Sequence, residues 1–129
     1  MPKQFDDWNK TKQGLDSIAS EAPFVSVGDL WWFSVGENIG SEMNGKSRLF
    51  SRPAVILKKL AHGFYLIAPS TTKSKVGTWY VPIKQNDVLM QICLHQIRTV
   101  DFRRLSTKLG TVDDADLQRI RIGFSKLYL

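Results

Sequence analysis

Cationic and aromatic side chains share one long segment of this 129-residue chain, and no acidic residue interrupts it. Between Met43 and Asn86 the cationic residues are Lys46, Arg48, Arg52, Lys58, Lys59, Lys73, Lys75 and Lys84. The aromatic residues of the same segment are Phe50, Phe64, Tyr65, Trp79 and Tyr80. Because cations meet phosphates and aromatic rings stack on bases, this pattern is typical of a surface that binds nucleic acid. From charge alone, the alternative is a solvated basic surface.

The composition excludes several classes of protein. A net charge of +6 and 43% hydrophobic residues are ordinary for a globular protein. The single cysteine, Cys93, excludes an intrachain disulfide, and the two histidines lie too far from it in sequence for a zinc motif. No apolar run reaches the roughly 18 residues of a membrane span, and the first residues lack the apolar core of a signal peptide. We therefore expect a cytoplasmic protein that uses no membrane, metal or other cofactor.

The pattern of apolar residues predicts a helical extension and linker over residues 1–26, followed by one domain over residues 27–129. In the extension, one side of a helical period carries Phe5, Trp8, Leu15, Ile18 and Ala19. In the domain, short apolar runs bounded by turn residues predict strands over 28–35, 52–60, 63–70, 78–83 and 88–100. A polar, glycine-containing loop is expected over 37–51.

A C-terminal helix is expected from a capping pattern, with Thr111 as the N-cap and Asp114 three residues later. One face of this helix repeats Leu117, Ile120, Phe124 and Leu127. Short strands without regular strand–helix alternation favour an α+β, mainly β fold, in which a small barrel carries a C-terminal helix and an added N-terminal helix.

Four segments occur in a fixed order, namely GDLWWFSVGENIGSE, RPAVIL, APSTTK and HQIRTVDFRRLSTKLGTV. Together they resemble the MazF/PemK (Kid-like) toxins of bacterial type II toxin–antitoxin pairs. The resemblance implies an SH3-like barrel, assembled as a homodimer, that cleaves single-stranded RNA such as mRNA selectively and without a metal. It also implies an antitoxin partner whose disordered acidic segment covers the RNA site, and DNA binding together with that antitoxin.

The resemblance assigns roles to individual residues. Arg52, before Pro53, matches the family's catalytic arginine, and Thr71 in APSTTK matches its catalytic threonine. Cleavage without a metal begins with attack of a 2′-hydroxyl on the adjacent phosphate. Arg52 suits stabilisation of the resulting charge and proton donation to the leaving oxygen, while Thr71 can orient a phosphate oxygen. Glu42, the acid of the matched GSE turn, is our hypothesis for the general base.

Further candidates for RNA contact are Ser41, Lys46, Arg48, Thr72, Lys73, Lys75, Trp79, Gln96 and Arg98. Two departures from the family pattern concern the same region. Six residues separate Gly45 from Arg52, more than in typical members, and His95 stands where an acid is usual.

Alternatives remain for these residues and for the function. Arg52 can cover a strand end, Thr71 can be a turn residue, and His95 can be a structural histidine with satisfied hydrogen bonds. Trp79 can stack on a base or pack on the barrel. A second function class is a non-hydrolytic toxin that binds a DNA topoisomerase, which has no chemical need for the arginine–threonine pair. A third is an inactive module that binds RNA without cutting it.

Overall fold

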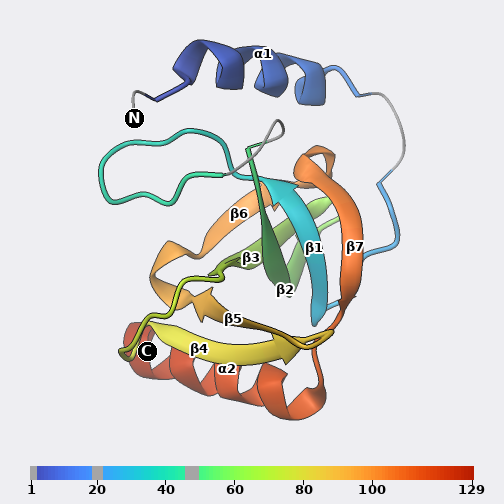
Figure 1. Cartoon of the computed structure of the whole chain (residues 1–129). Helices are drawn as coiled ribbons and strands as arrows, with labels where there is room; N and C mark the ends of the chain where they lie inside the picture. Colours follow the sequence, from blue (N-terminus) through green and yellow to red (C-terminus); the bar gives the residue numbers. More distant parts are fainter. Residues whose placement is uncertain (1–2, 19–21, 46–49) are drawn as a thin grey trace.

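The computed structural model describes residues 3–18, 22–45 and 50–129. In chain order the elements are α1 (Phe5–Asp16), β1 (Asp29–Ser34), β2 (Ser51–Ala61), β3 (Phe64–Thr71), β4 (Tyr80–Gln85), β5 (Val88–Cys93), the 3₁₀ turn η1 (Leu94–Gln96), β6 (Arg98–Asp101), the 3₁₀ turn η2 (Phe102–Arg104), β7 (Leu105–Thr111) and α2 (Asp114–Tyr128). The two helices lie at opposite ends of a curved sheet (Figure 1). No helix in the described ranges is long and apolar enough to cross a membrane.

The strands form one antiparallel sheet in the order β4-β5-β3-β2-β1-β7, and β6 also pairs with β3. β3 changes partner along its length, because Phe64–Ile67 pair with β6 whereas Ser70 and Thr71 pair with β5. The predicted α+β, mainly β fold with two added helices is confirmed. The sheet does not close into a complete barrel within the described residues. Instead, α2 packs beside β4 and adds the fully buried Ile120 to the core.

Both faces of the central strands are buried. On β1, Leu30 joins a core cluster with α2, whereas Trp31 and Phe33 join a second cluster on the other face. On β2, Val55 and Ile56 divide between the two clusters in the same way. Since side chains alternate between the faces of a strand, burial on both faces requires continuous apolar runs. Such runs are the signal that made these strands predictable.

The pairing of β2 with β3 is regular near the start of β2 and irregular near the hairpin turn. Ala54, Val55 and Ile56 face Pro69, Ala68 and Ile67 in an unbroken register. The register then shifts twice, between Ile56 and Lys58 and between Lys59 and Ala61. Each shift adds one residue to β2 relative to β3, as in a β-bulge.

The structure departs from the sequence prediction in three places. The single strand expected over 88–100 is two strands, because the η1 turn separates β5 from β6. β7 was not predicted, since its mostly polar, half-exposed residues give no apolar run. Asp113, not Thr111, caps α2, and its side chain accepts a hydrogen bond from the backbone N–H of Asp116 at 2.8 Å. The Thr111 hydroxyl instead lies 3.3 Å from Oδ1 of Asp29, to which it donates.

Candidate functional site

Arg52 and Thr71 lie at the facing ends of β2 and β3. Ala54 pairs with Pro69, so the same register, extended by two residues, places Arg52 opposite Thr71. The hydroxyl of Ser70 donates to the carbonyl oxygen of Pro53 at 2.9 Å and ties the strands together at this point. Strand register therefore assembles the two residues to which the resemblance assigned the chemistry.

The guanidinium of Arg52 is half-buried and held by backbone carbonyls. Its Nε donates to the carbonyl oxygen of Asn44, and its Nη1 lies 3.4 Å from the carbonyl oxygen of Ser70. Burial lowers the pKa of Arg52 from its ordinary value, but an arginine stays charged at neutral pH. No ion pair among the described residues involves Arg52. A half-buried, oriented cation without an acidic partner favours an anionic ligand.

A cavity of about 250 Å³ lies beside Arg52. Residues from β2, β3, β4, β5, η1 and the β1–β2 and β3–β4 loops line it. Six predicted site residues meet there, which are Ser41, Arg52, Thr71, Lys73, Lys75 and Gln96. No carboxylate from the described part of the chain lines this space. We call it the cationic cavity, after its three cations Arg52, Lys73 and Lys75.

Thr71 is buried at the inner wall of the cationic cavity, where its Oγ1 accepts a hydrogen bond from the backbone N–H of Lys73 at 3.2 Å. The hydroxyl proton of Thr71 remains available to an oxygen in the cavity. Cys93 also lines the wall. Burial raises the pKa of its thiol to about 11, so Cys93 is protonated at neutral pH and is a poor nucleophile.

Glu42 lies outside the cationic cavity. It lines an adjoining cavity of about 260 Å³ together with Arg98. Its Oε1 accepts a hydrogen bond from the backbone N–H of Ile39 at 2.9 Å, which closes a turn in the β1–β2 loop. Gln96 and His95 line both cavities. The structure therefore brings Glu42 to the neighbourhood of Arg52 but not to the same cavity.

Gln96 and Arg98 support the β1–β2 loop. The side-chain oxygen of Gln96 accepts from the N–H of Met43 at 2.9 Å, and its Nε2 donates to the carbonyl of Ser41 at 2.9 Å. Nη1 of Arg98 donates to the carbonyl oxygen of Val35 at 3.3 Å, and burial lowers the pKa of Arg98. Both the oxygen and the nitrogen of the Gln96 side-chain amide therefore make hydrogen bonds to the backbone of the β1–β2 loop.

His95 lines both cavities, whereas the sequence favoured a structural histidine with satisfied hydrogen bonds. Its ring stacks on Trp79 at a centroid distance of 5.0 Å and meets the edge of Tyr80 at 5.3 Å. Its Nδ1 is buried without a hydrogen-bond partner among the described residues. Burial lowers the pKa of the imidazole, which favours its neutral form. The sequence did distinguish this position, because His95 stands where the family resemblance places an acidic residue.

The remaining predicted RNA-contact residues divide into two groups. Thr72, Lys73 and Lys75 are exposed in the loop after β3. Trp79 keeps 52% of its surface exposed and stacks on His95, which lines the cationic cavity. Lys46 and Arg48 lie outside the described residues. No group of three or more His, Cys, Asp or Glu side chains in the described ranges is arranged to hold a metal ion.

Comparison with protein families gives a match over most of the chain. The family described as PemK-like, MazF-like toxin of type II toxin–antitoxin system matches residues 26–128. The helix α1 precedes the matched region. Among curated proteins, no significant match to the chain was found.

Solved structures with the same fold include MazF of Deinococcus radiodurans, with 23% identity and a TM-score of 0.69 over 84% of this chain and 97% of that chain. A MazE–MazF complex from Deinococcus radiodurans gives 21% identity and a TM-score of 0.62 over 84% of this chain and 96% of that chain. An endoribonuclease in complex with its cognate antitoxin, from a mycobacterial species, gives 16% identity and a TM-score of 0.63. That alignment covers 80% of this chain and 93% of the other.

Proposed function

Because this chain belongs to the PemK-like, MazF-like family of type II toxins, we propose that it is an endoribonuclease that cleaves single-stranded RNA. The observation that carries the proposal is the cationic cavity, where the Arg52 guanidinium and the Thr71 hydroxyl lie at facing strand ends. Lys73 and Lys75 add positive charge at its rim. A phosphate flanked by unpaired bases has the charge and size to enter such a cavity.

In the proposed reaction, the ribose 2′-oxygen attacks the adjacent phosphorus and the bond from phosphorus to the 5′-oxygen breaks. The products are a 2′,3′-cyclic phosphate and a 5′-hydroxyl. The charge that builds on the phosphoryl oxygens faces the Arg52 guanidinium, whose free N–H groups can bind two of these oxygens. Arg52 also supplies the proton that the leaving 5′-oxygen takes up, and Thr71 donates a hydrogen bond that orients a phosphoryl oxygen.

The 2′-hydroxyl must lose its proton to a base. Glu42 is the only carboxylate that lines either of the two adjoining cavities in the described part of the chain, and it is our candidate. Glu42→Gln keeps a side-chain oxygen for the Ile39 N–H and removes the basic carboxylate. We expect a loss of kcat of about 100-fold or more. Full cleavage by the variant would exclude Glu42 as the base.

We further propose that the protein works as a homodimer and is silenced by an antitoxin. An acidic, disordered antitoxin segment suits the cationic cavity by charge, and it would compete with RNA for Arg52, Lys73 and Lys75. Solved MazE–MazF complexes have the same toxin fold as this chain. Sedimentation or light scattering of the purified protein tests the dimer, and RNA competition by an acidic peptide tests the shared site.

The central experiment incubates the purified protein with a long single-stranded RNA in excess EDTA and maps the fragment ends. Arg52→Ala and Thr71→Val are compared with the matched control Lys58→Ala, which removes a cation from an exposed position further along β2. We expect discrete cuts with cyclic phosphate ends, retained by the control. Loss of either Arg52 or Thr71 should lower kcat by about 100- to 1000-fold.

The other outcomes separate the alternatives. Intact RNA, together with growth inhibition by the wild-type protein in cells, would reject the endoribonuclease and favour a non-hydrolytic toxin acting on another target. Tight, salt-dependent RNA binding without cleavage would favour an inactive RNA-binding module. Equal cleavage by wild type and Arg52→Ala would reject the assigned role of the arginine.

A further inference from the structure

The helix α1 buries one side chain against the domain. Trp8 is its only buried residue, whereas Phe5 on the same helix is 48% exposed. Since α1 also precedes the family region that begins at residue 26, its place in this protein is not explained by the shared fold. Figure 1 shows α1 lying across the end of the sheet, above the loop between β1 and β2.

The indole of Trp8 sits on both ends of that loop. At the first end it covers Gly36, where a Cβ would overlap the indole, so the close approach requires glycine. At the second end it packs on Phe50, with ring centroids 5.5 Å apart at an angle of 59°. The guanidinium carbon of Arg104 lies 5.5 Å from the indole centroid on the domain side. Trp8 is thus enclosed by the loop ends and the domain.

Hydrogen bonds close the loop beneath the indole. The carbonyl oxygen of Phe50 accepts from the N–H groups of Val35 at 2.9 Å and Gly36 at 3.1 Å. The N–H of Gly45 donates to the carbonyl oxygen of Gly36 at 2.8 Å. Phe50 has a positive φ of 51°, which is unusual for an aromatic residue and persists only when surrounding contacts hold it. The Trp8 ring supplies one of those contacts.

The same loop holds Arg52. Phe50 lies two residues before Arg52, and the carbonyl of Asn44 in the loop accepts from Nε of Arg52. Lys3, just before α1, donates to the carbonyl of Asn38 in the loop. A movement of the loop therefore changes the acceptor that orients the guanidinium. We propose that α1 is a brace for the β1–β2 loop and that Trp8 is a positioning residue for Arg52, a proposal that rests on the proposed RNA cleavage.

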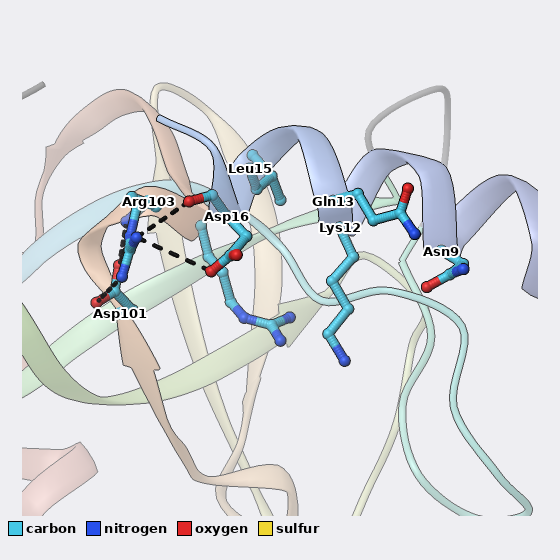
Figure 2. Close-up of a pocket in the computed structure, with 8 residues that line it drawn as sticks. Asn9, Lys12, Gln13, Leu15, Asp16, Asp101 and Arg103 are labelled. Atoms are coloured by element: carbon cyan, nitrogen blue, oxygen red, sulfur yellow. Dashed lines mark hydrogen bonds and ion pairs between the residues drawn. The ribbon is translucent and has the colours of Figure 1, made fainter. Parts of the chain in front are cut away.

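Other contacts of α1 are too few to replace Trp8. Its C-terminal end meets Arg103, whose Nη1 lies 3.1 Å from the carbonyl oxygen of Asp16 and 3.9 Å from the carboxylate (Figure 2). Asp16 is largely exposed, and an ion pair in water contributes little. Between this contact and Trp8, α1 and the η2 turn leave a cavity of about 370 Å³, lined by Asn9, Lys12 and Leu15 of the helix and by Arg104 of the turn. Removal of the indole should therefore free the loop from the helix.

The test compares full-length wild type with Trp8→Ala, the conservative Trp8→Phe and the matched control Phe5→Ala, which removes a half-exposed aromatic ring from the same helix. Hydrogen exchange measures the protection of the loop amides directly and does not require RNA. We expect the amides of Gly36 and Gly45 to exchange at least about 10-fold faster in Trp8→Ala, with the core amide of Ile67 unchanged. Trp8→Phe should restore most of the protection, and Phe5→Ala should resemble wild type.

Cleavage kinetics test the link to Arg52. Because the guanidinium acts on charge that develops in the transition state, its misplacement lowers kcat more than it changes KM. We expect kcat of Trp8→Ala to fall by up to about 100-fold and that of Trp8→Phe to fall less. Unchanged exchange of the loop amides in Trp8→Ala would overturn the proposal that α1 braces the loop. Faster exchange with unchanged kcat would overturn the positioning of Arg52.

These outcomes are distinct from failure of the proposed function. If wild type does not cut RNA, the endoribonuclease proposal fails, while loop exchange still decides whether α1 is a brace. If Trp8→Ala loses protection throughout β1–β3, the variant has unfolded, and Trp8→Phe then carries the test. Loss of kcat in Trp8→Phe without any change in loop exchange would also overturn the proposal.

Discussion

Substitution of Arg52 by lysine separates the charge of the proposed catalytic group from its geometry. Nε of Arg52 donates to Asn44 and Nη1 approaches the carbonyl oxygen of Ser70 at 3.4 Å. A guanidinium has five N–H groups, so about three remain for a phosphate when two are held by these carbonyls. The backbone thereby fixes the direction in which the remaining donors point.

A lysine keeps the charge but places its donors on one flexible nitrogen, which cannot bind both carbonyls and a phosphate in this arrangement. Loss of one preorganised donor costs about 2.7–4 kcal/mol, or about 100- to 1000-fold in kcat. We expect a loss in this range for Arg52→Lys. KM should change little, because the long-range attraction between lysine and RNA is retained.

The assay is single-turnover and steady-state cleavage of a fluorescent RNA with one mapped cleavage site, in EDTA. Arg52→Ala gives the kcat without a positive charge at this position, and Lys58→Ala controls for the removal of an unrelated cation. A kcat for Arg52→Lys close to that of wild type would refute the argument, since charge alone would then suffice. A large rise in KM at unchanged kcat would also refute it, because the effect would be on binding.

Three further predictions concern packing, protonation and salt. Gly123→Ala should lower stability by about 1 kcal/mol, measured as a lower urea midpoint. A Cβ there would lie 2.7 Å from Cδ1 of the buried Leu94, and overpacking outweighs the gain in helix propensity. His95 should titrate below its ordinary pKa of about 6.5 by NMR, because burial lowers its pKa. Since the unfolded chain then binds more protons, stability should fall as pH drops from about 6.5 through the folded pKa, and His95→Gln should flatten that slope. RNA affinity in a cleavage-deficient variant should fall with salt at a log–log slope of about −2.1 from three cationic contacts. Loss of Lys73 and Lys75 should reduce that slope to about −0.7.

The resemblance to the MazF/PemK toxins assigned the arginine–threonine pair, and the continuous apolar runs beside the two residues predicted the strands that carry them. Those runs mark strands buried on both faces, and RP and APST mark the strand ends that face one another. The strands β1–β4 and both helices were predictable for similar reasons. β7 was not, because a strand at the end of the sheet with mostly polar residues has no apolar signal.

The role of Gln96 and the position of His95 could not be predicted. Gln96 was expected at the RNA and does line the cationic cavity, and its amide also reaches Met43 and Ser41, which are 53 and 55 residues away in sequence. No local pattern reports a hydrogen bond of that separation. His95 reaches both cavities because η1 interrupts the strand that was expected over 88–100. The stacking of His95 on Trp79 depends on the same turn.

The two bulges in β2 have a consequence for how this domain tolerates changes in length. A one-residue slip between strands sends each side chain to the opposite face, and such a slip along β2 and β3 would separate Arg52 from Thr71. Both bulges lie between the regular register at Ala54–Ile56 and the hairpin turn at Ala61–Phe64. A residue gained or lost near that turn can be taken up by a bulge before the change reaches Ala54. The hairpin turn is therefore the place to insert a label or an affinity tag while the cationic cavity keeps its geometry.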